Sequence, residues 1–141
     1  VLTSIGSREE IAYMSDEHLQ GKTALIVDDA AIIRIMLTKV FSKHGIDVVG
    51  QATTGEEAIR LYGIKKPDLV TMDITMPGLD GIATIRSIIA DDPTARIIVV
   101  SALGQQSKMQ KSLAAGARDY IVKPIKEDPL MATVRRVLQS P

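Results

Sequence analysis

Residues 72–81 of the chain read MDITMPGLDG and follow directly on the apolar residues 69–71. The run 69–72 is short, unbroken and largely apolar, which is typical of a strand that is covered on both faces of a sheet. Pro77, Gly78 and Gly81 are turn residues, and they predict that the strand has ended before them. The strand therefore ends on Asp73, and a carboxylate at the end of a buried strand requires an explanation.

Composition limits the kinds of protein that this chain can be. Its 141 residues, 45% hydrophobic and 24% charged, are typical of one soluble globular domain. Seventeen basic residues balance seventeen acidic ones, so no net positive charge attracts a nucleic-acid backbone. The absence of cysteine excludes disulfides and thiolate chemistry. No apolar run approaches the ~18 residues of a membrane span and no segment resembles a signal peptide, so we expect a cytoplasmic protein without a nucleic-acid partner.

Residues 1–21 differ from the rest of the chain. Their apolar residues are scattered among charges without a sustained period, which predicts a loose leader or extension that buries no face of its own. Met14 would serve as a natural start, in which case residues 1–13 were added for expression; a short native helix around residues 9–13 is the alternative. The functional domain is expected to span residues 22–141.

From residue 22 onward, strand-like and helix-like patterns alternate. Residues 33, 36, 37, 40 and 41 are apolar at helical spacing, and residues 54–57 (TGEE) form a capping-box pattern that opens a second helix. The predicted strands are residues 23–27, 47–52, 69–72, 97–100 and 120–122. A helix follows each strand: the third carries Ile82, Ile85 and Ile89, the fourth spans residues 105–115, and the fifth begins at Asp128-Pro129 and carries Leu130, Val134, Val137 and Leu138.

Short strands that alternate with helices favour a parallel sheet covered on both faces. We therefore predict a flavodoxin-like α/β fold, with five parallel strands in the order 2-1-3-4-5 and five helices on both faces. The choice of this order is informed also by the family resemblance described below. In such sheets, ligands bind beyond the carboxyl ends of the strands, near strands 1 and 3.

Polar residues follow four of the predicted strands. Asp28 and Asp29 follow the first strand, Asp73 the third, Ser101 the fourth and Lys123 the fifth. Each residue alone has an ordinary explanation as a helix cap, a turn residue or part of a solvated loop. Together they are harder to explain in this way, because a parallel sheet brings all of these strand ends to one edge.

Three carboxylates at adjacent strand ends repel one another unless a cation lies among them. Oxygen ligands without His or Cys select a hard ion, and few protein ligands with retained waters suit Mg²⁺ better than Ca²⁺. Asp73 would attack a phosphorus atom to form an acyl phosphate, as carboxylate nucleophiles do. Lys123 would neutralise one phosphoryl oxygen, and the Ser101 hydroxyl would donate to another. The carboxylate that ends the strand is therefore interpreted as the group that is phosphorylated.

These segments resemble a known family, the receiver domains of two-component response regulators. The resemblance covers residues 22–141 and rests on Asp28-Asp29, Asp73 with residues 76–81 (MPGLDG), Ser101-Ala102 and residues 116–124 (GARDYIVKP). Residues 101–106 (SALGQQ) and the MDITMPGLDG segment are most similar to those of stand-alone chemotaxis regulators of the CheY kind.

The resemblance implies how the site would be occupied. Asp73 would accept a phosphoryl group from a histidine kinase. Mg²⁺ would be bound by Asp29, Asp73 and the backbone carbonyl of Thr75, and Asp28 would support the ion through a water. In this family the side chains at positions 75 and 103, here Thr75 and Leu103, flank the path of the hydrolytic water and would tune the lifetime of the phosphorylated form.

The predicted function is a phosphorylation-dependent signalling switch that promotes its own phosphotransfer and self-dephosphorylation and is not a turnover enzyme. By the resemblance, Ser101 and Lys123 would read out the phosphoryl group, and Tyr120 would change rotamer with Ser101. The partner surface would comprise the helix 105–115, the strand 120–122 and the last helix, which follow these two residues in the chain. A histidine kinase, a downstream protein such as the flagellar switch, and a phosphatase are the expected partners.

Three alternatives remain open at this point. The chain could be the receiver part of a larger response regulator or hybrid kinase. It could also be a small Mg²⁺-dependent phosphohydrolase with Asp73 as nucleophile, although enzymes resembling haloacid dehalogenases usually place a second Asp where this chain has Thr75. A flavin-binding module on the same fold is disfavoured, because the loop after the first strand offers acids to a phosphate.

Overall fold

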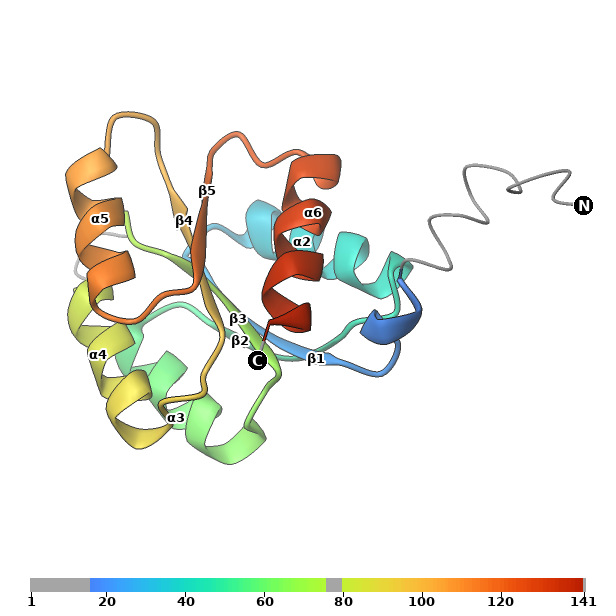
Figure 1. Cartoon of the computed structure of the whole chain (residues 1–141), viewed down its shortest axis with the longest axis horizontal. Coiled ribbons are helices and arrows are strands. Elements are labelled where there is room, and N and C mark those ends of the chain that lie inside the picture. The colour runs from blue at the N-terminus through green and yellow to red at the C-terminus, as the bar shows by residue number, and fades with distance from the viewer. Residues whose placement is uncertain (1–15, 76–79, 141) are drawn as a thin grey trace, which may run out of the picture.

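The computed structural model describes residues 16–75 and 80–140, within which five parallel strands form one sheet in the order β2-β1-β3-β4-β5 (Figure 1). The strands are β1 (Thr23–Val27), β2 (Asp47–Ala52), β3 (Leu69–Asp73), β4 (Ile97–Ser101) and β5 (Asp119–Val122). A 3-10 helix, η1 (Glu17–Leu19), precedes them, and the α-helices are α2 (Ala31–Lys43), α3 (Gly55–Lys65), α4 (Gly81–Asp91), α5 (Gln106–Ala114) and α6 (Glu127–Gln139). The predicted fold class and strand order are confirmed.

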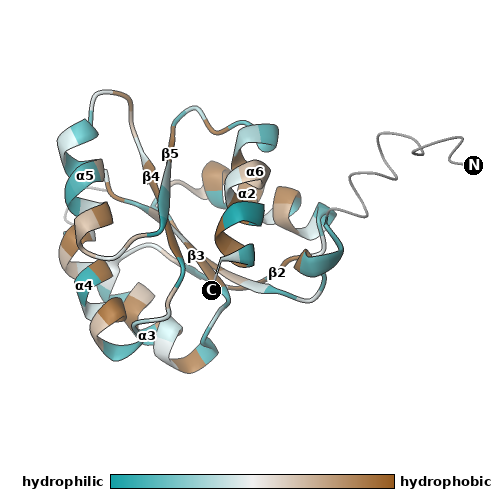
Figure 2. Cartoon of the chain, in the orientation of Figure 1, coloured by the Kyte–Doolittle hydropathy of each residue, from teal (hydrophilic) through white to brown (hydrophobic). Residues whose placement is uncertain are grey.

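The helices divide into two groups that cover opposite faces of the sheet. One face carries α2 and α6, whose Leu37, Phe41 and Leu130 are packed with β-strand residues in one apolar cluster. The other face carries α3, α4 and α5 around a second cluster that includes Ile85 and Met109. Every residue of β3 and β4 is buried, which explains why these strands are unbroken apolar runs (Figure 2). None of the helices in the described part of the chain is long and apolar enough to cross a membrane.

Helix starts agree with the sequence patterns at α3 and differ at α6. The hydroxyl of Thr54 accepts from the amide of Glu57 at 3.1 Å, as expected for a capping box. The Glu57 carboxylate accepts from the amide of Thr53, one residue before the N-cap, at 3.0 Å. The last helix begins at Glu127, not at Asp128-Pro129 as predicted. Pro129 lies within its first turn, where a backbone N–H would have no helical partner and its loss costs little.

The segment before β1 packs onto the domain. Leu19 of η1 is fully buried with the α2 and α6 cluster, and the side chain of Asp16 is almost fully buried. Burial of a leucine side chain contributes about 2 kcal/mol, so this segment is attached to the core. The expectation of a loose segment that buries no face is therefore wrong for residues 16–21. Residues 1–13, and the question of their origin, lie outside the described residues.

Strand register determines which side chains meet at the carboxyl edge of the sheet. Val27 of β1 lies beside Met72 of β3, so Asp28 and Asp73 follow at the same height. Ser101 of β4 lies beside Val122 of β5, so Lys123 leaves the sheet next to Ser101. The four strand ends singled out in the sequence thus form one edge, as the parallel arrangement predicts.

Candidate phosphorylation site

Three acidic side chains meet at the ends of β1 and β3. Asp28, Asp29 and Asp73 each place one carboxylate oxygen within 4.8 Å of the others. Asp28 and Asp73 are each 2% exposed, whereas Asp29 is exposed at the rim. The sequence prediction that the three carboxylates share one site is consistent with this geometry.

The turn after β1 holds Asp28 in place. Its Oδ1 accepts from the amide of Ala30 at 2.9 Å, and its backbone carbonyl accepts from the guanidinium of Arg34 at 2.9 Å. Helix α2 is capped by Ala30 without a side-chain hydrogen bond, so Asp28 shapes the turn before the helix and does not cap it. Nothing in the sequence pattern singled out Arg34, because its contact is to a backbone carbonyl.

Both oxygens of Asp73 have hydrogen-bond donors. Its Oδ1 accepts from the amide of Thr75 at 2.8 Å and from the Thr75 hydroxyl at 2.6 Å. Its Oδ2 accepts from the Lys123 ammonium at 3.0 Å. Residues 76–79, the MPGL part of the opening segment, lie outside the described residues. Gly81 packs so closely against Ile74 that a Cβ at position 81 would lie 2.9 Å from a methyl carbon, which explains the glycine at the start of α4.

Lys123 is the cationic partner of two of the acids. Its ammonium lies 3.0 Å from Asp73 Oδ2 and 3.5 Å from Asp28 Oδ2, and its side chain is 27% exposed. Burial by itself lowers the pKa of Lys123, but the hydrogen bonds and charges of Asp73 and Asp28 outweigh this effect and raise it above its usual value. Lys123 therefore carries a full positive charge at neutral pH.

Charge at this site is not balanced. Burial, followed by the nearby charge of Asp73, raises the pKa of Asp28 although the amide of Ala30 and Lys123 favour its ionised form. One ammonium thus faces three carboxylates, and two of the three are buried. A donor set made only of oxygens with excess negative charge fits a hard divalent cation such as Mg²⁺.

Ser101 and Tyr120 lie at different depths. Ser101 is completely buried, and its hydroxyl donates to the carbonyl of Ala102 at 3.2 Å. Tyr120 is 43% exposed on β5, where it lines a surface groove of about 330 Å³ together with Pro124 and Lys126. The ordinary expectation that a strand tyrosine is part of the core therefore does not apply to Tyr120.

The two predicted tuning residues also differ in surroundings. Thr75 is partly buried against Asp73, whereas the side chain of Leu103 is 80% exposed in the turn after β4. Their influence on a hydrolytic water stays a prediction.

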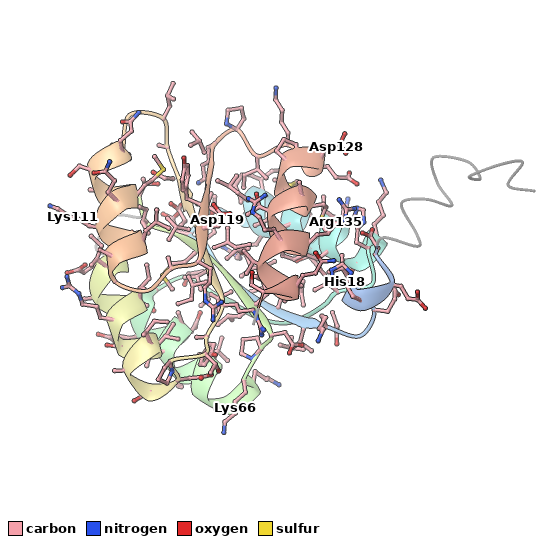
Figure 3. The ribbon with its side chains drawn as sticks, in the orientation of Figure 1. His18, Lys66, Lys111, Asp119, Asp128 and Arg135 are labelled. Carbon is pink, nitrogen blue, oxygen red and sulfur yellow. The ribbon has the colours of Figure 1, made fainter. Side chains whose placement is uncertain are left out.

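Sequence reasoning missed a group of ion pairs away from the strand ends. His44, to which no role was assigned, places Nδ1 at 2.6 Å from Asp16 and Nε2 at 3.0 Å from Glu127. Arg135 pairs with Asp16 at 2.5 Å, and Lys43 with Glu127 at 2.9 Å. These five residues, called the ion-pair cluster below, join η1 to α2 and α6. Helix α6 lies beside η1, where Figure 3 labels Arg135 and His18.

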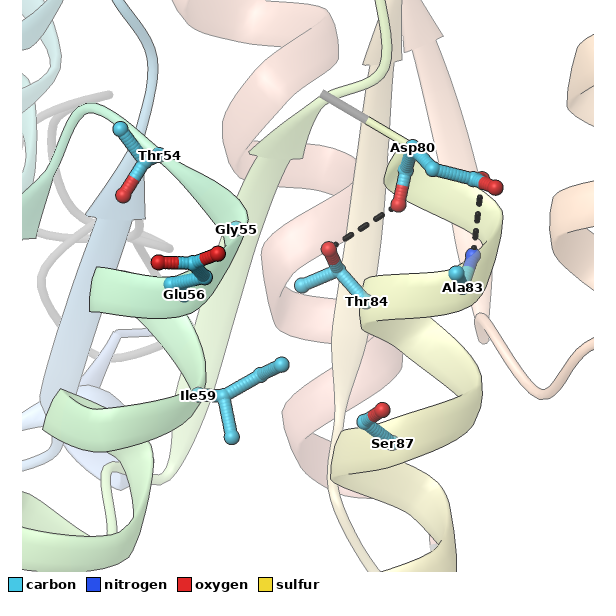
Figure 4. Close-up of a pocket in the computed structure, with 8 residues that line it drawn as sticks. All are labelled: Thr54, Gly55, Glu56, Ile59, Asp80, Ala83, Thr84 and Ser87. Carbon is cyan, nitrogen blue, oxygen red and sulfur yellow. Dashed lines mark hydrogen bonds between the residues drawn. The ribbon is translucent and has the colours of Figure 1, made fainter. Parts of the chain in front are cut away.

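A second hollow lies between α3 and α4 (Figure 4) and has a volume of about 450 Å³. Two of its polar residues form the start of α4: the Asp80 side chain accepts from the amide of Ala83 at 3.0 Å, and the Asp80 carbonyl accepts from the Thr84 hydroxyl at 3.0 Å. No sequence pattern predicted this hollow, and its hydrogen bonds are those of a capped helix start.

A doubly wound parallel sheet with acids and one lysine at its carboxyl edge defines a class of phosphoryl-accepting signalling domains. Comparison with known proteins supports this class, because residues 24–135 match the response regulator receiver domain family. The chain belongs to that family.

The similar proteins include chemotaxis regulators. The chain is 49% identical over 117 residues to the chemotaxis protein CheY of Thermotoga maritima, which covers 83% of this chain and 98% of that protein. It is 46% identical over 114 residues to CheY of Bacillus subtilis, or 81% of this chain and 95% of that protein. A crystal structure of the CheX–CheY–BeF₃–Mg²⁺ complex from Borrelia burgdorferi matches with a TM-score of 0.81 and 36% identity, over 86% of this chain and 92% of that one.

The predicted resemblance is confirmed by these comparisons. The chain is a receiver domain homologous to CheY, and its function is that of a phosphorylation-dependent signalling switch in chemotaxis. Homology to chemotaxis regulators favours this function over a phosphohydrolase or a flavin-binding module.

Proposed function

We propose that Asp73 is the phosphoacceptor of this switch. The observation that carries the proposal is the surroundings of its carboxylate: Asp73 is buried, is hydrogen-bonded to Lys123 at 3.0 Å, and lies beside two further carboxylates. One of its oxygens attacks the phosphorus of a phosphohistidine, the P–N bond breaks, and its electron pair stays with the imidazole. Asp73 is restored when the acyl phosphate is hydrolysed, so the chain acts as a switch and promotes its own phosphorylation and dephosphorylation.

Mg²⁺ would be bound by Asp29, Asp73 and the backbone carbonyl of Thr75, with Asp28 acting through a water. When bound, the ion supplies positive charge to the carboxylates and to the incoming phosphoryl oxygens. The excess of carboxylates over ammonium groups at this edge supports the assignment. The B. burgdorferi CheY structure, which contains Mg²⁺ and BeF₃, supports the same kind of site.

Lys123 and Ser101 would contact the phosphoryl group after transfer. Lys123 already lies against Asp73, so a small movement carries its ammonium to a phosphoryl oxygen. The Ser101 hydroxyl, now bonded to the carbonyl of Ala102, would turn toward the new acceptor. Its shift would be reported by Tyr120, whose exposed ring lies on the neighbouring strand β5.

The output surface would consist of α5, β5 and α6. Helix α5 and strand β5 follow Ser101 in the chain and α6 follows Lys123, and the groove beside Tyr120 lies between β5 and α6. A histidine kinase would be the phosphodonor, and a downstream protein such as the flagellar switch would bind the output surface. The B. burgdorferi CheY structure is a complex with CheX. We therefore also propose that a further protein, such as a phosphatase, acts on the phosphorylated state of this chain. We place the protein in the cytoplasm, with residues 22–141 as the receiver domain.

The acceptor assignment is tested with acetyl phosphate and Mg²⁺, followed by intact mass. Wild type should gain one phosphoryl group, and Asp73→Asn should stay folded and gain none, because the amide keeps the shape without being a nucleophile. A comparable mass increase in Asp73→Asn would show that another residue is the acceptor.

The output surface is tested by NMR with BeF₃ and Mg²⁺. Resonances of residues 105–138 should shift together with those of Asp28, Asp29 and Asp73. If shifts were confined to the three aspartates, the proposed output surface would be wrong.

A further inference from the structure

Asp29 is held in place less directly than the other two acids of the site. Asp28 and Asp73 are buried, and each accepts hydrogen bonds that fix its side chain. Asp29 is exposed, and within residues 16–75 and 80–140 no hydrogen bond reaches its carboxylate. The position of this carboxylate therefore depends on the backbone from which it extends.

The peptide that joins Asp28 to Asp29 is held by a side chain of α2. Strand β1 ends at Val27, so the carbonyl of Asp28 lies past the last paired residue of the strand. The guanidinium of Arg34 donates from Nη1 to this carbonyl at 2.9 Å, and from Nε to the side-chain oxygen of Gln51 on β2 at 3.1 Å. A guanidinium is planar and rigid, so these two donations together fix its orientation.

The direction of the Asp28 carbonyl has a consequence for Asp29. A peptide unit is planar, so the direction of a carbonyl determines where the next Cα lies, which here is that of Asp29. Asp28 is anchored by its amide, which donates to the Ala52 carbonyl at 3.0 Å, and by its carboxylate, which accepts from the amide of Ala30 at 2.9 Å. Arg34 holds the carbonyl of the same residue, and so sets the direction from which the Asp29 side chain reaches the other two acids.

We propose that Arg34 is a positioning residue for Mg²⁺ binding, because it holds the 28–29 peptide in the orientation that keeps the exposed Asp29 carboxylate beside the two buried ones. The inference rests on the proposed function, with Asp29 as a Mg²⁺ ligand. Arg34 acts through Asp29 and does not contact the ion itself.

The charge and the hydrogen bonds of Arg34 act on Mg²⁺ binding in opposite directions. A guanidinium this close to the site repels a divalent cation, so loss of its charge alone would tighten binding. Loss of its hydrogen bonds frees the 28–29 peptide, so the ion must order Asp29 as it binds, and binding weakens. The sign of the change in affinity therefore separates the two effects.

The test compares two substitutions that remove the same charge. Arg34→Met keeps most of the side-chain stem and removes the donors. Arg60→Met is the matched control, since Arg60 is an exposed residue of α3 on the opposite face of the sheet from α2. Mg²⁺ affinity is measured by NMR titration without a phosphodonor, after circular dichroism has shown that each variant is folded.

We expect the affinity of Arg34→Met for Mg²⁺ to fall about 3- to 10-fold, and that of Arg60→Met to stay within about twofold of wild type. The effect at Arg34 should be at the low end for an outer-shell partner, because the waters that Mg²⁺ retains can adjust. Unchanged or tighter binding by Arg34→Met would overturn the inference, since tighter binding is the result expected from charge alone.

A double-mutant cycle tests whether Arg34 acts through Asp29. In the Asp29→Ala background, Arg34→Met should change Mg²⁺ affinity by less than about twofold, because the carboxylate that Arg34 positions has gone. An equal fold loss in both backgrounds would overturn the inference, since Arg34 would then act on the site independently of Asp29.

Phosphorylation by acetyl phosphate gives a second readout. The Mg²⁺ concentration for half the maximal rate should rise in Arg34→Met by the same factor as the affinity falls, with the rate at saturating Mg²⁺ within about twofold of wild type. A lower rate at saturating Mg²⁺ with unchanged affinity would overturn the inference. If Arg34→Met did not fold, Gln51→Ala would decide, because it frees the guanidinium by truncating an exposed side chain: an affinity loss of about 2- to 3-fold supports the inference, and unchanged affinity overturns it.

Failure of the proposed function would be seen without any change at position 34. In that case wild type would not bind Mg²⁺, or Asp29→Ala would bind it as tightly as wild type. A protein that loses affinity in Asp29→Ala but not in Arg34→Met would keep its metal site, and only the role of Arg34 would be removed.

Discussion

The site at the ends of β1 and β3 and the ion-pair cluster between η1, α2 and α6 contain the same kinds of side chain in different balance. At the site, one ammonium faces three carboxylates. In the ion-pair cluster, Asp16 and Glu127 are matched by Lys43 and Arg135, with His44 between the two acids. The first arrangement holds excess negative charge, and the second is close to neutral.

The pKa values of two buried aspartates, Asp16 and Asp28, show the effect of this difference in charge balance. Burial alone would raise the pKa of Asp16, but hydrogen bonds from Arg135 and His44 outweigh burial and hold the pKa below its usual value. Burial raises the pKa of Asp28, and the neighbouring charge of Asp73 raises it further. A charge that the fold has compensated contributes to stability, whereas an uncompensated charge indicates a site that binds something absent from the chain.

Among the substitutions that test this comparison, Asp16→Ala should have the largest effect. It leaves Arg135 and His44 without their buried acceptor, so the free energy of unfolding should fall by about 2 kcal/mol. Urea denaturation measures the change. Lys43→Ala is the control, because that ion pair is exposed and should contribute about 0.5 kcal/mol or less. Equal losses of unfolding free energy in both variants would show that the burial of Asp16 does not increase its contribution to stability.

Removing an acid from the site should instead change ligand binding. Asp29→Ala deletes a proposed ligand that is exposed and bears little on packing, so Mg²⁺ affinity should fall about tenfold or more with stability nearly unchanged. Calorimetric titration with Mg²⁺ measures this change. Asp47→Ala, an exposed acid at the opposite end of the sheet, should leave the affinity within about twofold. Unchanged affinity in Asp29→Ala would argue against a metal site at the end of β1.

The site should also control how long the switch stays on. Thr75→Asn combined with Leu103→Glu supplies longer polar groups that can hold a hydrolytic water, so loss of the phosphoryl group should be about tenfold faster, or ~1.4 kcal/mol in the barrier. The decay of phosphorylated protein in Mg²⁺ after removal of the donor gives the rate. An equal or slower decay would show that these two positions do not time the switch.

The smallest expected effect has the opposite sign to the first. Asp28→Asn keeps an oxygen for the amide of Ala30 but removes a poorly compensated charge, so the Mg²⁺-free protein should gain about 1 kcal/mol at pH 7. Because the pKa of folded Asp28 lies above 3.8, its ionisation costs stability as the pH rises through that raised pKa. The gain should therefore vanish below about pH 4, where wild type is protonated at this residue in both states.

Chemical denaturation at several pH values tests whether the stability changes of these aspartate variants have the expected sign. For Asp16, whose pKa is lowered, the stability that ionisation contributes is present above 3.8 and is lost as the pH falls through the folded pKa. Asp16→Asn should thus lose its destabilising effect in acid, while Asp28→Asn loses its stabilising effect. A stability gain of Asp28→Asn that persisted at pH 3 would show that its cause is not charge.

The sequence was sufficient for the fold because its signals are local and repeated. Unbroken apolar runs at β3 and β4 required a sheet covered on both faces, and parallel strands then brought Asp28, Asp73 and Lys123 to one edge. What escaped prediction depends on single contacts between distant segments. No periodic pattern connects Asp16, His44 and Arg135, and their pairing follows only from how η1 and α6 pack.

The torsion angles of single side chains also could not be predicted from the sequence. Thr75 could be identified by its position two residues after Asp73, but the donation of its hydroxyl to Oδ1 depends on one torsion angle. The start of α6 was placed wrongly for a similar reason. Asp128-Pro129 has the composition of a helix start, and the three-dimensional arrangement begins the helix earlier, where Glu127 pairs with α2.

The two helices that flank β5 in the chain are anchored very differently. Helix α5 has nine residues and buries only Met109 and Ser112 within the described residues. Helix α6 has thirteen residues, buries six of them, and is fastened by Glu127 and Arg135 to neighbouring segments. A movement of Ser101 or Lys123 should therefore displace α5 more readily than α6. We expect α5 to move while α6, on the opposite face of the sheet, stays in place, so a protein that contacts both helices would detect the change in the distance between them more than a change in the shape of either one.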